Sequence, residues 1–66
     1  METIKMNYGW IAEYNTGADL RRATADELRA SLEAARTDGG AGVIEVDGLT
    51  CYVAGESAEA RAEVMA

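Results

Sequence analysis

The chain has 66 residues, a formal net charge of −6, one cysteine and no histidine. A chain of this length buries only about 60% of the surface that its unfolded form exposes, so we expect a single domain over residues 1–66 with modest stability. One cysteine excludes a disulfide within the chain, and the lack of histidine leaves no ordinary ligand set for structural zinc. There is no run of about 18 apolar residues and no basic segment followed by an apolar run, so we expect no membrane span, no secretion and a cytoplasmic location.

The acidic residues are unevenly distributed along the chain. Residues 1–36 contain six acids and five bases, whereas residues 37–66 contain six acids and one arginine. An acidic second half disfavours contact with nucleic-acid phosphates and complements a basic protein surface. Acids that simply keep a small protein soluble explain the same composition.

The N-terminal quarter has a pattern typical of strands. Apolar and polar residues alternate from Thr3 to Tyr8, which predicts a half-buried strand. Gly9 interrupts this pattern before the extended segment WIAEY, so Gly9 is either a bulge in one long strand or part of a turn between two. Residues 15–23 are polar and rich in turn-forming types, and we expect a loop there that Leu20 anchors to the core.

Thr24 begins the clearest helix. The sequence TADE is typical of a capping box, in which the Thr24 hydroxyl accepts from the Glu27 backbone N–H and the Glu27 carboxylate accepts from the Thr24 N–H. The sequence DGG, residues 38–40, ends the helix, because glycine adopts the left-handed conformation required beyond a helix terminus. One apolar stripe follows the spacing of a helix face: Leu28, Leu32 and Ala35.

The segment from Gly42 to Val53 predicts a β-hairpin. Asp47-Gly48 lies between two β-rich runs and suits a type I′ turn, which needs positive φ at both central positions. The expected cross-strand pairs are Val46 with Leu49, Glu45 with Thr50, Ile44 with Cys51 and Val43 with Tyr52. The expected apolar face carries Ile44, Val46, Leu49, Cys51 and Val53, and the mixed outer face carries Val43, Glu45, Thr50 and Tyr52.

After Gly55 the sequence predicts a short C-terminal helix with Ser57 as its N-cap, with fraying or disorder as the alternative because its apolar residues are mostly alanine. The expected fold class is α+β, a small single domain with one or two N-terminal strands, one main helix, a C-terminal hairpin and a short terminal helix, around an antiparallel sheet with helices on one face. The expected core includes Ile4, Met6, Trp10, Leu28, Leu32, Ile44, Val46, Leu49 and Val53.

Three motifs favour a structural explanation over a chemical one. The sequence GGAG, residues 39–42, follows a helix and enters a strand, which reverses the context of a phosphate-binding loop. Glu45, Asp47 and Asp38 lack the ligand spacing of a calcium loop, so we expect no metal site. Cys51 has no histidine that would favour its thiolate, so we expect a buried apolar side chain, no catalytic residue and no cofactor.

The aromatic residues allow two interpretations. Tyr8, Trp10 and Tyr14 are either part of the core or, together with Tyr52, an exposed contact patch, because so small a domain does not obviously bury them all. We interpret Arg21-Arg22 as a solvated basic spot, since two charges supply little affinity for phosphates, and we expect no direct nucleic-acid binding.

The run RRATADELRASLEAARTDGGAGVIEVDGLTCYV, from Arg21 to Val53, resembles small proteins of unassigned function from actinobacteria and their phages. The resemblance covers about half of the chain. It implies no activity and supplies no catalytic residues. Phage-encoded acidic proteins of this size include anti-CRISPR proteins and other inhibitors of host machinery, which is an analogy of size and charge.

We therefore expect a non-enzymatic, acidic protein-interaction module that occupies a basic surface of a larger host protein. Its sharpest form is a phage-encoded, anti-CRISPR-like inhibitor of a nucleic-acid-binding machine. The alternative is a small self-associating structural domain, a homodimer formed through a free sheet edge or the terminal helix. An enzyme is supported only by Cys51 and scattered carboxylates. The expected contact residues are Trp10, Tyr14, Glu45, Asp47, Tyr52, Glu56, Glu59 and Glu63.

Overall fold

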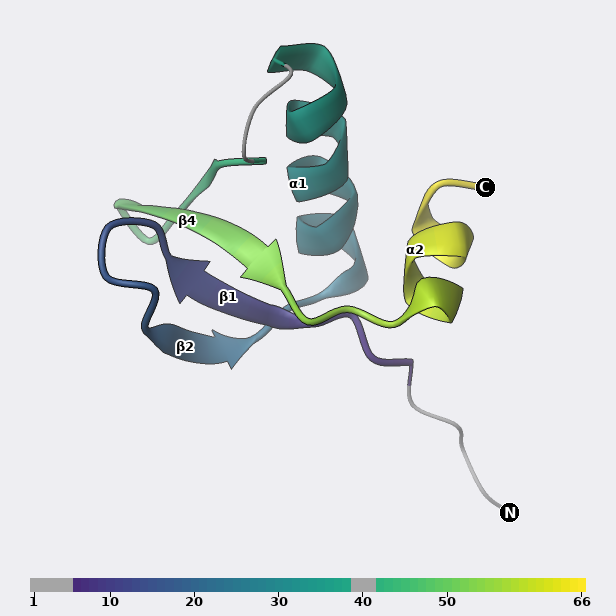
Figure 1. Ribbon diagram of the computed structural model, residues 1–66, viewed down its shortest axis with the longest axis horizontal. Coiled ribbons are helices and arrows are strands. Elements are labelled where there is room, and N and C mark those ends of the chain that lie inside the picture. Colours follow the sequence, from purple (N-terminus) through teal and green to yellow (C-terminus); the bar gives the residue numbers. More distant parts are fainter. Residues whose placement is uncertain (1–5, 39–41) are drawn as a thin grey trace.

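The computed structural model describes residues 6–38 and 42–66, and in these ranges two helices pack with a four-stranded antiparallel sheet (Figure 1). The strand order is β2-β1-β4-β3, so β1 and β4 are central and the other two strands form the edges. The expected α+β class with an antiparallel sheet is confirmed. The elements are β1 (Trp10–Glu13), β2 (Asp19–Arg22), α1 (Ala25–Asp38), β3 (Ile44–Val46), β4 (Leu49–Ala54) and α2 (Ala58–Val64).

The first described strand, β1, begins at Trp10, and residues 6–8 belong to no strand. The predicted strand from Thr3 to Tyr8 is therefore wrong over residues 6–8, while its first three residues lie outside the described part of the chain. Gly9 is buried with a φ of 92°, and a Cβ at this position would lie 2.7 Å from the carbonyl oxygen of Ala54. Gly9 is thus neither a strand bulge nor a turn between two strands, but the point where the chain passes closely over the end of β4.

Hydrogen bonds to the start of α2 explain why the segment before Gly9 is not a strand. The Asn7 carbonyl accepts from the Ser57 backbone N–H at 3.0 Å, and the Asn7 side chain donates to the Gly55 carbonyl at 3.0 Å. The Asn7 side-chain oxygen also accepts from the Gly9 N–H at 3.0 Å. These contacts replace the regular ladder of a strand, because the connection between β4 and α2 is itself irregular.

The polar segment after β1 contains a strand, β2, where the sequence analysis predicts a loop. It pairs with β1 through Trp10 with Arg22 and Ile11 with Arg21, and the register then shifts at a bulge. Every residue of β2 is exposed, so no alternation of buried and polar side chains marks it in the sequence. Leu20 is 46% exposed, and the prediction that it anchors this segment to the core is wrong.

The start of α1 is a capping box, as predicted. The Glu27 backbone N–H donates to the Thr24 hydroxyl at 3.2 Å, and the Thr24 N–H donates to the Glu27 carboxylate at 2.9 Å. Leu28 is fully buried in a cluster with Ala60 and Val64 of α2. Ser31, also buried, donates its hydroxyl to the Gly42 carbonyl at 2.7 Å and so fixes the entry to β3 against α1.

The hairpin forms with the predicted turn and register. Asp47 and Gly48 have φ values of 53° and 81°, which is the positive-φ pair of a type I′ turn. The fourth predicted pair, Val43 with Tyr52, lies outside the ladder, because β3 begins one residue after Val43. Leu49 is 45% exposed at the tip, so its predicted place on the buried face is wrong. The observed pairs are Ile44 with Cys51, Glu45 with Thr50 and Val46 with Leu49.

The core lies between α1, α2 and one face of the sheet, since α1 contacts β3, β4 and α2. The predicted C-terminal helix is present, and its N-cap Ser57 accepts from the Ala60 N–H at 3.1 Å. Tyr8 and Val53 pack against both buried clusters and so join them. Trp10 is only half-buried and belongs to neither cluster, which corrects its expected place in the core. One cluster comprises Ile11, Ala23, Val46 and Cys51, and the other Leu28, Ala60 and Val64.

Candidate functional site, an open sheet face with aromatic residues

The sheet has one face that the helices leave open. Side chains alternate along β1 and β4, and their register places Ile11 and Cys51, both fully buried, on the face under α1. Their neighbours therefore point the other way, and no element within residues 6–38 and 42–66 packs over them. The central strands contribute Trp10, Ala12, Tyr52 and Ala54 to this open face.

Three of the predicted contact residues lie on the open face. Tyr14 follows β1 and packs edge-on against Tyr52, with ring centroids 6.3 Å apart and planes at 88°. Trp10 lies at the start of β1, and the Arg22 guanidinium lies 4.6 Å from its ring centroid, a cation–π contact. Ala12, between them, is only 1% exposed, so larger neighbouring groups shield the strand. The open face thus carries three aromatic side chains, of which Tyr14 and Tyr52 contact each other and Trp10 contacts Arg22.

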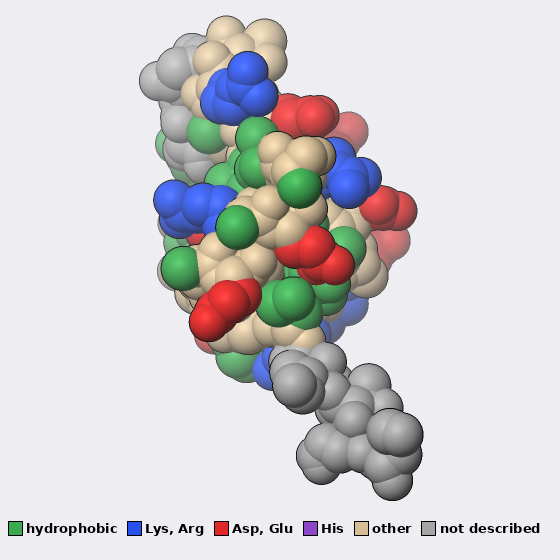
Figure 2. Space-filling model, turned by 90° about the vertical axis from the view of Figure 1, so that its right-hand side faces the viewer, with side chains coloured by type: hydrophobic (Ala, Val, Ile, Leu, Met, Phe, Trp, Pro, Cys, Tyr) green, Lys and Arg blue, Asp and Glu red, His purple; other side chains and the backbone are tan. Residues whose placement is uncertain are grey.

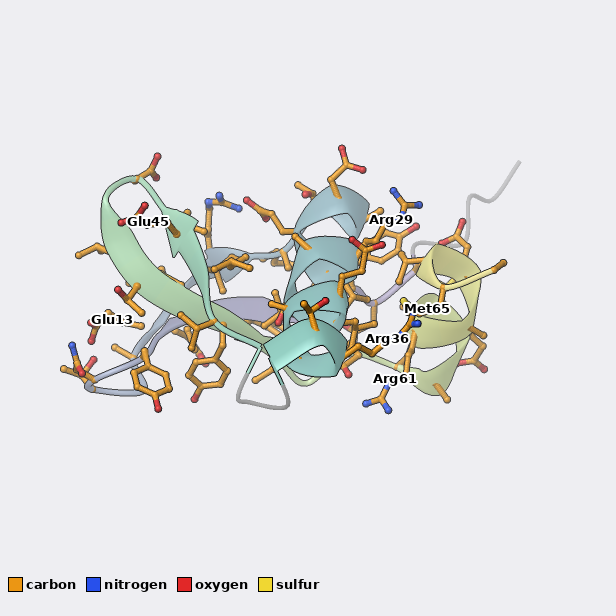
Figure 3. All side chains as sticks on the ribbon, turned by 90° about the horizontal axis from the view of Figure 1, so that it is seen from above. Glu13, Arg29, Arg36, Glu45, Arg61 and Met65 are labelled. Atoms are coloured by element: carbon orange, nitrogen blue, oxygen red, sulfur yellow. The ribbon has the colours of Figure 1, made fainter. Side chains whose placement is uncertain are left out.

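Two acidic contact residues extend this surface at the hairpin. Glu45 is exposed and pairs with Thr50, the neighbour of Tyr52 along the open side of β4. Asp47 is exposed in the turn. Neither carboxylate forms an ion pair with another residue of the described part of the chain. Figure 3 shows Glu45 at the hairpin end of the molecule, away from Met65 at the end of α2.

The predicted acids near α2 form a separate group, and two of them have structural partners. The Glu56 carboxylate pairs with Arg61 at 2.7 Å and is 10% exposed. Glu63 accepts from the Tyr8 hydroxyl at 2.7 Å, and this hydrogen bond raises the pKa of Tyr8. Glu59 is exposed and makes no ion pair within the described ranges. Acidic and basic side chains are interspersed on the face that carries α2, so the acidic half of the sequence makes no continuous acidic surface there (Figure 2).

Both arginines of the basic spot at Arg21-Arg22 contact other side chains of the fold. Arg21 donates to both carboxylate oxygens of Glu27, at 2.9 and 2.6 Å, and this contact is the main cause that lowers the pKa of Glu27 to about 2. Arg22 covers Trp10 on the opposite face. The Arg22–Trp10 contact has no signal in the sequence, because it depends on the pairing of β2 with β1, and β2 has no hydrophobic pattern.

Cys51 is fully buried in the core, as predicted for an apolar role. Within the described ranges, no three histidine, cysteine, aspartate or glutamate side chains are grouped to hold a metal ion. The helices of the same ranges are all too short or too polar to cross a membrane. The absence of catalysis and of a cofactor stays a prediction.

Comparison of the chain with models of protein families, with curated proteins and with solved structures finds no match. The resemblance to small actinobacterial and phage proteins therefore stays a prediction. The class that the structure defines is a small α+β domain with α1 on one face of its sheet, α2 packed against α1, and aromatic residues on the other face.

Proposed function

We propose that this protein is a non-enzymatic interaction module that binds a basic surface of a larger protein through the open sheet face and the hairpin. The observation that supports this best is the grouping of Trp10, Tyr14 and Tyr52 with Glu45 on a face that no described element covers. Among the described residues, Glu45 has no ion-pair partner. Exposed tryptophan and tyrosine are the residue types that carry most binding energy in protein interfaces.

The aromatic residues supply affinity at a low entropic cost. Tyr14 is 49% exposed yet is held against Tyr52, and Trp10 is held by Arg22, so binding would immobilise few additional torsions. Preorganised side chains retain more of their contact energy as affinity than flexible ones do. The open face is therefore better suited to a stable protein contact than an ordinary solvated surface with flexible side chains.

The carboxylates supply the preference for a basic partner. The net charge of −6 attracts such a partner at long range. Glu45 lies on the same face as the aromatic residues and Asp47 lies in the adjoining turn, and neither has an ion-pair partner in the described part of the chain. A protein surface that binds nucleic acid is basic, so occupation by this module would exclude the phosphate backbone. In its sharpest form the proposed function is thus anti-CRISPR-like inhibition of a host nucleic-acid-binding machine, in the cytoplasm.

The proposed contact set is narrower than the set expected from the sequence. Glu56 and Glu63 hold Arg61 and Tyr8 within the fold, so we leave them out of the proposed interface. Glu59 belongs to α2, which lies away from the hairpin (Figure 1). These placements make Glu59 a useful control, since it has the same charge as Glu45 at a different place.

Self-association is the second candidate function. It is favoured by large apolar side chains that remain exposed, Leu20 on the edge strand β2 (46%) and Leu49 at the hairpin tip (45%). Light scattering across a dilution series separates the two candidates, because a homodimer dissociates on dilution whereas a module for another protein is monomeric throughout.

The test of the proposed function compares variants in affinity purification from the native host. We expect one set of partner proteins to be recovered with the wild type and with Glu59→Lys, and to be lost with Glu45→Lys and with Tyr52→Ala. The recovered contact should weaken as salt increases, because exposed charges are screened. Equal recovery and equal salt dependence for all four proteins would refute the proposed surface.

A further inference from the structure

A groove runs between the free edge of β3 and the first half of α1. Residues 44–47 of the hairpin form one wall, Asp26, Glu27 and Ala30 form the other, and Arg21 lies between them. Successive residues of a strand point to opposite sheet faces, yet all four hairpin residues line this groove. The groove therefore follows the edge of the strand and not one of its faces.

The register directs backbone groups of β3 into this groove. Val46 and Leu49 flank a two-residue turn, which makes them a hydrogen-bonded pair, so the next pair, Glu45 with Thr50, is not hydrogen-bonded. The Tyr14 N–H donates to the Thr50 carbonyl at 2.8 Å, which shows independently that the Thr50 backbone is directed to the other side, towards β1. The N–H and C=O of Glu45 thus point away from β4, into the groove.

The two edges of the sheet differ in how they are protected. β2 contains a bulge, and the Arg21 guanidinium donates to the Arg22 carbonyl at 3.1 Å, which occupies an outward-facing acceptor. Bulges and inward-reaching charged side chains are common ways of protecting an edge. β3 is only three residues long, but it has a continuous register with β4 and contains neither lysine nor proline, so the outward backbone groups of Glu45 stay open to a further strand.

We infer that this groove binds an extended segment of the partner protein, which adds to β3 as a strand and carries lysine or arginine side chains. Strand addition is a common mode of peptide recognition, in which the backbone supplies affinity and alternate side chains supply specificity. The inference rests on the proposed function and deepens it, because it names the part of the partner that is recognised.

Charge complementarity identifies the occupant as basic. Of the four carboxylates along the groove, only Glu27 is neutralised closely, by Arg21 at 2.6 Å. Asp26 is 3.5 Å from Arg29 with its side chain 93% exposed, and Glu45 and Asp47 have no ion-pair partner in the described part. Successive side chains of an added strand point to opposite sides of the sheet, so basic residues at every second position share one side, where they would meet the carboxylate of either Glu45 or Asp26.

The test uses the isotopically labelled full chain and a synthetic peptide of alternating lysine and valine. Two further versions are N-methylated at alternate residues, so that each blocks the hydrogen bonds of one peptide edge. We expect the unmodified peptide and the version methylated on the edge away from β3 to slow hydrogen exchange of the Glu45 amide. The version methylated on the edge that faces β3 should leave this exchange unchanged. A peptide of alternating glutamate and valine should not bind. Equal binding by all lysine peptides with unchanged Glu45 exchange would overturn the inference, because it shows contact by charge alone.

Ala30→Arg provides a matched test within the protein. The position is exposed on α1, so the helix tolerates arginine, and the new side chain fills and charges the groove. We expect it to weaken peptide binding by about tenfold or more, whereas Ala62→Arg on α2 has little effect. Equal binding by both variants would also overturn the inference.

The two proposals can fail separately. If the peptide fails to bind while Tyr52→Ala still loses the host partner, this inference fails and the proposed function stands. If the peptide adds to β3 while Tyr52→Ala and Glu45→Lys recover all host proteins, the proposed open-face contact fails instead.

Discussion

The carboxylate of Glu27 links the start of α1 to β2. It accepts from both terminal nitrogens of Arg21, at 2.9 and 2.6 Å, and from the Thr24 backbone N–H at 2.9 Å. The hydrogen bond from Arg21 is the largest cause that lowers the pKa of Glu27 to about 2, below its usual value of 4.5. Each contact favours the ionised carboxylate, so protonation of Glu27 weakens the folded state.

The sign and size of the effect follow from this shift. Since the pKa of the folded state is lowered, the stabilisation is fully present above about pH 4.5 and is lost as the pH falls towards 2. At ~1.4 kcal/mol for each unit, the whole shift would correspond to about 3 kcal/mol. Arg21 is 45% exposed, however, and solvent screens an exposed pair, so we expect a contribution of about 1–2 kcal/mol.

We predict that Glu27→Gln lowers the free energy of unfolding by about 1–2 kcal/mol near neutral pH, and that the difference from the wild type nearly vanishes near pH 2. Glutamine keeps an acceptor for the Thr24 N–H, so the substitution isolates the charge. Urea unfolding followed by circular dichroism across this pH range measures the effect. Glu33→Gln, at an exposed position of the same helix, is the control. A stability difference for Glu27→Gln that stays constant with pH would refute the reasoning.

Three further substitutions probe other contacts. Gly9→Ala should lower the free energy of unfolding by about 2 kcal/mol or more, because its φ is positive and a Cβ there would lie 2.7 Å from a backbone oxygen. Gly17→Ala, where φ is also positive but the surrounding space is open, should lower it by less. Equal losses for the two variants would contradict the close approach at Gly9. Ser31→Ala should cost about 1–2 kcal/mol in urea unfolding, since it removes a buried 2.7 Å hydrogen bond to the carbonyl before β3, and unchanged stability would argue against that bond. Arg22→Gln should cost about 0.5–1 kcal/mol and alter the fluorescence of Trp10, the sole tryptophan, and an unchanged spectrum would exclude the stacking.

The parts of the fold that follow from the sequence are those with local signals. The capping box of Thr24 and Glu27 and the positive-φ turn at Asp47-Gly48 depend on residues within a few positions of one another, and both form as predicted. β2 has no such signal, because all its side chains are exposed and only its pairing with β1 makes it a strand. Leu20 is apolar by type, yet its place at an edge beside a bulge leaves it in solvent.

The candidate site follows from the sequence only in part. Tyr8, Trp10 and Tyr14 would share one face if the strand were continuous through Gly9. The φ of 92° at Gly9 breaks the alternation, so Tyr8 enters the core while the other two lie on the open face. The contact of Tyr14 with Tyr52 depends on the pairing of β1 with β4, and no local pattern contains that long-range information.

The hydrogen bonds between the N-terminal segment and α2 also affect the order in which the chain folds. They join residues 48 to 55 positions apart, through Asn7 with Gly55 and Ser57, and Tyr8 with Glu63. Closing so long a loop costs entropy before these contacts compensate for it, so they form late. During synthesis on the ribosome, the core side chain of Tyr8 therefore has no complete environment until α2 has emerged. The contacts within α1 and within the hairpin are more local, so these elements can form before α2 emerges.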